Sequence, residues 1–405
     1  MEALRLGGRS LVAHLALIEI DPNCDPLGCW NKFILAAGLL GDTNVTTAGR
    51  YSVGAKSPLT GGVKEASVGG SAGQKMARLG FRAVVLEDVP DNPQTNILVV
   101  SKEKAVIIPA PEYKNLTVRA SFQRLRDQFG KDAGVISVGP AGEMMMAGAG
   151  VATTDKAGVQ IRFAGRGGMG AVMGSKGIKA IVFDDTGAPP GEAHDRKALN
   201  AANKKLVQLL MDDPKTENRH NFGTPAVLAL CNTLGILPTR NFSAGQFEQV
   251  DAISGETIAE LIDKRGGEGR KGQPCIQGCV IQCSNVFADP GGKATVASLQ
   301  YENIALLGSN CDISDIDEIA ELNDLCNEAG LDAIETGAAI GVAMDAGVIP
   351  FGDAEGAKDL IRQALRGSPL GRIIGNGVVI TGKIFGISRV PAVRGQAIPA
   401  YDPRS

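Results

Sequence analysis

Short apolar runs separated by turn residues dominate the first part of the chain. The clearest runs are rich in β-branched residues and cover residues 33–37, 83–86, 97–100 and 105–108. Glycine, proline, asparagine or aspartate bound each run, a pattern typical of β-strands. Residues 120–129 are the clearest helix in this part. We therefore predict a mainly β-structured domain over residues 1–187.

The pattern changes at a loop that contains Gly187 and two consecutive prolines. Beyond it, Asp195 can cap a helix over residues 196–211, and Thr257 and Ser314 each begin a capping pattern. Apolar residues at 316, 319, 322 and 325 recur at helical spacing, and Gly330 is a natural helix stop. We predict an α-helical domain over residues 188–405 and an α+β fold class.

Composition narrows the class of function. The chain of 405 residues carries a formal net charge of −3, so no strong positive field indicates nucleic acid or an anionic membrane as partner. No apolar run reaches the length of a membrane span of about 18 residues, and the start of the chain lacks the order of a signal peptide. These features favour a cytoplasmic protein that acts on small molecules.

The segment 164–176 contains five glycines within ten residues, together with Arg166 and Lys176. Bare backbone N–H groups beside positive side chains suit an anionic ligand that carries phosphate. The segment is neither a P-loop nor a clean strand, G-x-G-x-x-G, helix unit. A simple glycine-rich turn remains the alternative interpretation.

Three cysteines, Cys275, Cys279 and Cys283, follow one another at intervals of four residues. They would lie along one stripe of a helix or converge from a loop kinked at Gly278. A disulfide framework is improbable in a chain of this length without a secretory signal. An iron–sulfur cluster fits the spacing better than zinc, and buried free thiols are a third alternative.

The other cysteines carry weaker signals. Cys24 and Cys29 lie in a segment rich in proline and glycine and could bind a metal, although isolated thiols are the simpler interpretation. Cys231, Cys311 and Cys326 have apolar neighbours and are expected to be small core residues. One of these three would be the fourth cluster ligand only if the fold brought it near Cys283.

Several segments occur in the same order as in one known family. They are residues 56–61, 139–143 and 165–176, the three cysteines, Tyr301-Glu302, residues 330–332 and residues 401–404. Together they resemble the tungsten-containing aldehyde ferredoxin oxidoreductase family. Agreement over nearly the whole chain is strong evidence of homology, which by itself does not establish activity.

The resemblance implies cofactors and site residues. In the family an N-terminal β-saddle holds a tungstopterin, which is tungsten or molybdenum with two molybdopterins, and a magnesium ion bridges their phosphates. By position, the pterin-binding residues of this chain would be Arg50, Ser67, Gly69, Arg166, Gly167, Asn327 and Asp332. Asn327 stands where the family motif has aspartate. The three cysteines would hold a [4Fe–4S] cluster.

The resemblance also implies a reaction, in which an aldehyde is oxidised to a carboxylic acid and the electrons pass through the cluster to ferredoxin or a ferredoxin-like subunit. Glu302 would lie beside the tungsten as the catalytic residue, the alternative being a structural glutamate. Rival functions are an aryl-CoA reductase subunit, a catalytically incomplete cofactor-binding fragment and a zinc-stabilised structural protein.

The family motif at Tyr401-Asp402-Pro403-Arg404 is internal in other members, whereas this chain stops at Ser405. We therefore expect the family's C-terminal domain to be absent. Three alternatives stay open: another chain supplies it, this sequence is a fragment of a gene, or the site is incomplete. A homodimer is a further open alternative.

Overall fold

The computed structural model describes residues 5–92, 94–155 and 161–404. Contacts divide the chain into two compact units. The first comprises the chain up to Asp213 together with Pro274–Val280, and the second comprises Pro214–Gln273 and the chain from Ile281 onward. This division differs from the boundary that we predicted after residue 187, because helix α6 (Arg196–Met211) and the segment with Cys275 and Cys279 group with the first unit.

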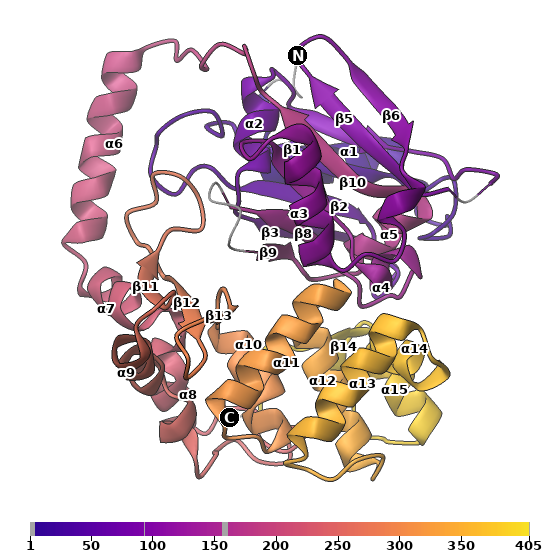
Figure 1. Cartoon of the computed structure of the whole chain (residues 1–405), viewed down its shortest axis with the longest axis vertical. Coiled ribbons are helices and arrows are strands. Elements are labelled where there is room, and N and C mark those ends of the chain that lie inside the picture. The colour runs from indigo at the N-terminus through magenta and orange to yellow at the C-terminus, as the bar shows by residue number, and fades with distance from the viewer. Residues whose placement is uncertain (1–4, 93, 156–160, 405) are drawn as a thin grey trace. The chain divides into compact units, whose positions relative to one another are not determined.

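Two sheets form the first unit (Figure 1). The antiparallel four-stranded sheet has the order β3 (Val63–Val68), β2 (Tyr51–Lys56), β1 (Phe33–Ala37), β4 (Ala83–Leu86). The six-stranded sheet has the order β6 (Ala105–Pro109), β5 (Asn96–Ser101), β10 (Ile178–Asp184), β7 (Gly134–Ser137), β8 (Val151–Thr154), β9 (Ile161–Ala164), and only β5 and β10 pair in parallel. All four predicted strands are confirmed.

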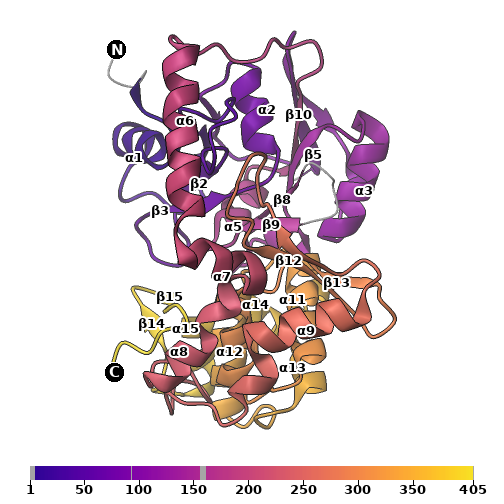
Figure 2. The same cartoon turned by 90° about the vertical axis from the view of Figure 1, so that its left-hand side faces the viewer.

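Helices cover these sheets in layers because side chains along a strand alternate between its faces. Ile34 and Ala36 of β1 pack on α1 (Gly8–Glu19), while Phe33 and Leu35 face the core shared with the second sheet. That core also receives α2 (Ala72–Arg78) and α5 (Met169–Ser175), and α3 (Val118–Phe129) covers the far face of the six-stranded sheet. Figure 2 shows α1 and α3 at opposite sides of this unit. We did not predict α1, whereas α3 confirms the helix expected over residues 120–129.

The glycine-rich segment runs from β9 through a turn into α5. A strand therefore leads into a helix at this segment, and our view that it is not a clean strand-to-helix unit is wrong. Gly168 precedes the helix in the left-handed region, with φ of 78°. Gly174 allows α5 to pack directly against α4 (Pro140–Glu143) and the backbone of Gly142. Part of the glycine content therefore serves packing rather than ligand binding.

Replacing Gly174 by alanine is expected to destabilise the first unit by about 1–3 kcal/mol, the usual cost of overpacking a core. The added Cβ would lie 2.0 Å from the carbonyl oxygen of Gly142, so one of the two short helices must move. Chemical denaturation measures the loss. Gly62→Ala is the control, since its Cβ would meet no atom closer than 3.9 Å. Equal stability of the two variants would contradict this account of Gly174.

The second unit is mainly helical, as predicted. Its helices are α7 (Pro214–Phe222), α8 (Leu228–Thr233), α9 (Gly255–Arg265), α10 (Tyr301–Leu307), α11 (Ile316–Ala329), α12 (Ala333–Asp345), α13 (Ala354–Arg366), α14 (Pro369–Gly375) and α15 (Val378–Phe385). A small sheet of β11 (Arg270–Gln273), β12 (Ser284–Ala288) and β13 (Ala294–Val296) and a hairpin of β14 (Ala392–Val393) and β15 (Gln396–Ala397) complete it. The α+β class is thus confirmed.

The predicted helix ends are partly right. Asp195 caps α6, and Gly330 ends α11 in the left-handed conformation. The other two caps are wrong: Ser254 rather than Thr257 caps α9, and Asp315 rather than Ser314 caps α11. Several residue types can cap a helix, so neighbouring candidates compete in the sequence. None of the helices among the described residues combines the length and apolar character that a membrane crossing requires.

Candidate cofactor and active site

The three cysteines lie in the connection between β11 and β12, not on a helix. Gly278, with φ of 79°, bends this loop, which decides between the two predicted arrangements. Its part from Pro274 to Val280 belongs to the first unit, where the N–H of Gly70 donates to the carbonyl oxygen of Cys275 at 2.8 Å. Cys283 follows where the chain has re-entered the second unit.

Arg50 joins this loop to the edge of the first sheet. Its Nε donates to Ser67 Oγ at 3.0 Å and its Nη2 to the Ser67 carbonyl oxygen at 2.8 Å. The remaining Nη1 lies 3.8 Å from the Sγ of Cys275. A guanidinium thereby supplies positive charge beside a sulfur that would bind a metal as a thiolate.

Gly69 lies next to this contact. A Cβ on Gly69 would meet the carbonyl oxygen of Cys275 at 2.7 Å, so the loop can approach only a glycine there. The structure therefore gathers Arg50, Ser67, Gly69 and Cys275 at one place. The close approach of the cysteine loop therefore explains why residue 69 is glycine. A contact between Gly69 and a pterin stays a prediction.

Arg166 and Gly167 lie elsewhere in the first unit. Ser57, which directly follows β2, donates from Oγ to the carbonyl oxygen of Gly167 at 2.7 Å. Arg50 precedes β2, so it and Ser57 stand at opposite ends of a strand whose length is about 20 Å at 3.3 Å per residue. The predicted pterin-binding residues of this unit thus form two groups, one at each end of β2.

The donor sets fit the cofactors implied by the sequence. All three loop cysteines are free thiols, which are the ligands of iron–sulfur clusters. Arg50, partly exposed Arg166 and the turn at Gly167 offer donors that suit phosphate-bearing groups. The chemistry of these residues therefore agrees with a cluster and an anionic cofactor.

Glu302 lies in the first turn of α10 in the second unit and is half-buried. Its Oε2 accepts a hydrogen bond from the backbone N–H of Ala400 at 2.7 Å. The preceding Tyr301 donates from its hydroxyl to the carbonyl oxygen of the same Ala400, and its ring lies 5.1 Å from that of Tyr401. Burial and then the negative charge of Glu302 raise the pKa of Tyr401. Glu302 therefore has a structural task, and its catalytic role stays a prediction.

The predicted pterin motif around Asp332 is the connector between two helices. Gly330 ends α11, and Asp332 caps α12 by accepting from the N–H of Ile334 at 3.1 Å. Asn327, in the last turn of α11, is buried as well. Capping alone accounts for an aspartate at position 332, and pterin binding by either residue stays a prediction.

The three cysteines with apolar neighbours are buried, as the sequence predicted. Cys231, Cys311 and Cys326 are all buried free thiols of the second unit. Burial raises the pKa of the Cys311 and Cys326 thiols well above the ordinary value, which disfavours the thiolate that a metal needs. Cys311 and Cys326 therefore fit the predicted role of small core residues.

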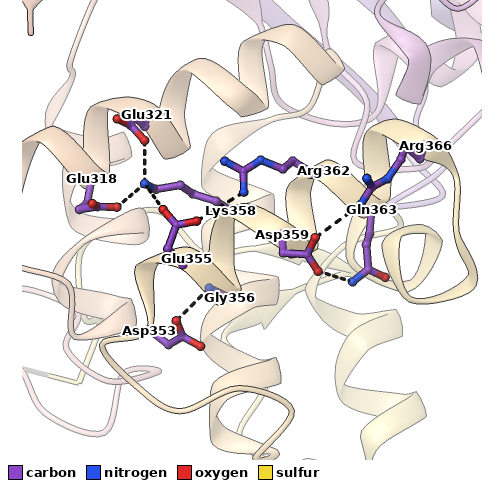
Figure 3. A network of polar contacts seen from close by, with 10 residues as sticks. All are labelled: Glu318, Glu321, Asp353, Glu355, Gly356, Lys358, Asp359, Arg362, Gln363 and Arg366. Atoms are coloured by element: carbon purple, nitrogen blue, oxygen red, sulfur yellow. Dashed lines mark hydrogen bonds and ion pairs between the residues drawn. The ribbon is translucent and has the colours of Figure 1, made fainter.

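An acidic group on α11 and α13 was not predicted. Glu318, Glu321 and Glu355 are, over the residues that the structure describes, the one group of three whose carboxylates approach closely enough to share a metal ion. The ammonium of Lys358 already lies among them, at 2.5, 2.6 and 2.7 Å (Figure 3). The lysine therefore supplies the positive charge that a metal ion would bring.

The Lys358→Met variant is expected to lose about 1–2 kcal/mol at neutral pH, since a buried cation with three carboxylate partners is removed. Burial lowers the pKa of Lys358, but the hydrogen bonds that its ammonium donates to Glu318, Glu321 and Glu355 outweigh this and raise the pKa above its usual value. The wild-type advantage is therefore complete below the unfolded lysine's pKa of about 10.4 and shrinks as the pH rises above it. Denaturation of both proteins at pH 7 and at alkaline pH measures this, and an advantage that grew with pH would contradict it.

The sequence profile described as "Aldehyde ferredoxin oxidoreductase, N-terminal domain" matches residues 1–185, and the one described as "domains 2 & 3" matches residues 201–405. Our expectation that the family's C-terminal domain is absent is thus wrong, because the second profile includes domain 3 and extends to the end of the chain.

Individual relatives agree with this. The tungsten-containing aldehyde ferredoxin oxidoreductases of Pyrococcus furiosus and Thermococcus kodakarensis are each 32% identical over 98% of this chain. The chain spans 66% of the length of these relatives. A P. furiosus protein named "Aliphatic sulfonate oxidoreductase, WOR-like subunit" is 23% identical over 84% of this chain.

One solved structure has the same fold. It is the active site complex BamBC of benzoyl coenzyme A reductase with 1,5 dienoyl-CoA, with a TM-score of 0.80 and 18% identity over 98% of this chain and 62% of that one. At this identity the likeness bears on the fold alone. The two profiles, which together cover nearly all of the sequence, show that this chain belongs to the aldehyde ferredoxin oxidoreductase family.

Proposed function

We propose that this chain binds a tungstopterin and a [4Fe–4S] cluster and oxidises an aldehyde to a carboxylic acid. The observation that carries the proposal is the position of Arg50, which contacts Ser67 of the predicted pterin site and Cys275 of the predicted cluster loop. This contact supports a proposal in which the two sites are adjacent, as electron transfer from one cofactor to the other would require. The names of the relatives, which are tungsten-containing oxidoreductases, support the same assignment.

Each residue has a task in this proposal. Cys275, Cys279 and Cys283 hold the cluster. The phosphate-bearing pterins would be held by residues of the first unit, a β-saddle in this proposal, and by two residues of the second. These residues are Arg50, Ser67, Gly69, Arg166 and Gly167, with Asn327 and Asp332, and magnesium would be a further ion of the site. When bound, the tungstopterin would supply two-electron redox chemistry and the cluster would supply one-electron transfer.

Glu302 is the proton acceptor of the proposed reaction. Its carboxylate removes a proton from the water or hydrated aldehyde that supplies the new oxygen. The hydrogen bond from the N–H of Ala400 fixes the carboxylate's orientation through Oε2. A carboxylate with a fixed orientation loses less entropy when it engages the substrate.

The electrons leave to ferredoxin or to a ferredoxin-like subunit, and the reaction takes place in the cytoplasm, where cluster thiols remain reduced. Partner subunits are supported by two relatives, one named as a WOR-like subunit and the other as part of the BamBC complex. A homodimer is an alternative arrangement.

The experiment that tests the proposal combines metal analysis with a dye-linked assay on protein purified without air. We expect near-stoichiometric tungsten or molybdenum, about four irons per chain and reduction of a viologen dye by aldehydes. Aryl-CoA thioesters are tested in parallel, because the BamBC likeness makes an aryl-CoA reductase subunit the rival. Turnover of thioesters alone would favour that rival. Metals without turnover of either substrate would indicate a cofactor-binding chain that needs a partner, and absence of all metals would overturn the proposal.

A further inference from the structure

Two cysteines outside the proposed site flank a closed turn of the first unit. The N–H of Gly28 donates to the carbonyl oxygen of Asp25 at 3.0 Å, and the Asp25 side chain accepts from the N–H of Leu27 at 3.0 Å. A turn of this kind holds its first and last Cα atoms within about 7 Å. Cys24 directly precedes it and Cys29 directly follows it. The backbone thus brings the two residues toward the Cα separation of about 4.4–6.8 Å that a disulfide requires.

The two thiols differ in accessibility. Both are free, Cys29 is exposed, and Cys24 is buried with 8% of its surface exposed. An exposed thiol can be attacked by, or can attack, a molecule in solution. A buried neighbour can react only with the first sulfur. This pairing of an accessible and a shielded thiol is the usual arrangement of an attacking and a resolving cysteine.

Two buried lysines hold the segment that carries these thiols. Lys176, which directly follows α5, donates from Nζ to the carbonyl oxygen of Gly28 at 2.9 Å. Lys56, the last residue of β2, donates from Nζ to the carbonyl oxygens of Pro22 and Cys24, both at 2.6 Å. Lys176 lies close enough to Cys29 for an electrostatic interaction between the ammonium and the sulfur. The positive charge of the two lysines also opposes the binding of a metal cation. Burial raises the pKa of the Cys24 thiol, and Lys56 acts in the opposite direction.

We propose that Cys24 and Cys29 form a redox-active dithiol that reacts with low-molecular-weight disulfides. The Cys29 thiolate attacks the external disulfide, forms a mixed disulfide and releases one thiol of the reagent. The Cys24 thiolate then attacks the Cys29 sulfur and releases the second thiol. The external disulfide is reduced to two thiols by two electrons, and the protein loses two protons to solvent or to the leaving thiolates.

The two lysines that hold the cysteine segment also border the glycine-rich segment. Lys56 is followed by Ser57, whose hydroxyl donates to the carbonyl oxygen of Gly167, and Lys176 closes the helix that begins after Gly168. This dithiol lies apart from the three loop cysteines in the sequence, and its reaction is independent of the proposed aldehyde chemistry.

The test is incubation of the purified full chain with oxidised glutathione, followed by digestion and mass spectrometry of the peptide that contains both cysteines. We expect that peptide to lose two hydrogen atoms and to regain them with a reductant. The Cys24→Ser variant cannot complete the second step, so it should accumulate glutathione on Cys29. Cys29→Ser should carry neither modification, because the remaining thiol is buried.

Lys176→Gln provides a test of the electrostatic argument and should slow the first step several-fold without preventing the disulfide. Two results would overturn the proposal. One is wild-type protein that keeps glutathione on Cys29 without closing the ring, which would make Cys29 an isolated reactive thiol. The other is a peptide that remains unmodified in the wild type while an unstructured cysteine peptide in the same tube is oxidised.

Discussion

Replacing Glu335 by alanine is expected to cost the second unit about 2–5 kcal/mol, because each of two buried backbone donors that loses its acceptor costs about 1–3 kcal/mol. Glu335 lies on α12 with 0% of its surface exposed. Its Oε1 accepts from the N–H of Val378 at 3.0 Å, and its Oε2 accepts from the N–H of Ala397 at 2.9 Å. One carboxylate thereby joins the start of α15 and strand β15 to the central helix.

Truncation leaves these two backbone N–H groups without their acceptor. It also opens a cavity beside Gly377, which packs so closely on the carboxylate that a Cβ added there would lie 2.7 Å from Oε1. Denaturant unfolding of the full chain, followed by far-UV circular dichroism, measures the loss. Glu335→Gln should lose less, because one amide oxygen can still accept from one of the two N–H groups.

The matched control is Glu260→Ala on α9. This glutamate is exposed, so its removal should change the free energy of unfolding by no more than about 0.5 kcal/mol. If the Glu335 and Glu260 variants unfolded at the same denaturant concentration, the proposed bridging role of Glu335 would be wrong.

Glu335 also shows where the sequence contains information that pattern reasoning missed. It is the one charged residue between Asp332 and Asp345, in a run that is otherwise alanine, glycine and other uncharged residues. Such a residue on a buried helix must have buried partners, since an unpaired charge there is too costly. The partners, however, lie 43 and 62 residues further along the chain, and no local pattern identifies them.

Strands and helix ends were predictable to the extent that local chemistry determines them. The strand at 33–37 and the cap at Asp195 were found because β-branched runs and capping side chains act within a few residues. α1 carries no capping side chain at Gly7 that would mark its start in the sequence. α5 was missed because glycine lowers helix propensity and the segment that contains this helix is rich in glycine. Packing of Gly174 against Gly142 compensates for that cost in the folded chain.

For the candidate site, the sequence supplied the residue types and the structure supplied their neighbours. Three cysteines at a spacing of four residues allowed a helix or a loop, and only the fold decides for the loop. The contact from Arg50 to Cys275 joins positions 225 residues apart, which a single sequence cannot reveal. Conversely, Asp332 and Gly69, which were assigned through the family resemblance alone, turn out to have structural tasks as well.

Replacing Glu302 by glutamine is expected to lower kcat/KM for aldehyde oxidation by about 10²–10⁴-fold, the usual contribution of a general base. Glutamine has nearly the same shape, and its amide oxygen can still accept the hydrogen bond from the N–H of Ala400. The fold and the metal content should therefore be retained. The measurements are the viologen-linked assay, the metal analysis and the pH dependence of kcat/KM, whose acidic limb should disappear in the variant.

A purely structural Glu302 gives a different pattern of results. Glu302→Gln would then keep nearly full activity, and Glu302→Ala would lose stability because the N–H of Ala400 lacks its acceptor. Glu260→Gln, on an exposed face of α9, controls for the general effect of removing one negative charge. The two roles also differ in which side chains at position 302 can restore the lost property. A structural role is restored by any acceptor that reaches Ala400, whereas a catalytic role requires a group that can take up a proton. The glutamine variant therefore distinguishes the structural role of Glu302 from its proposed catalytic role. It preserves an acceptor for the N–H of Ala400 and removes the carboxylate that would take up a proton.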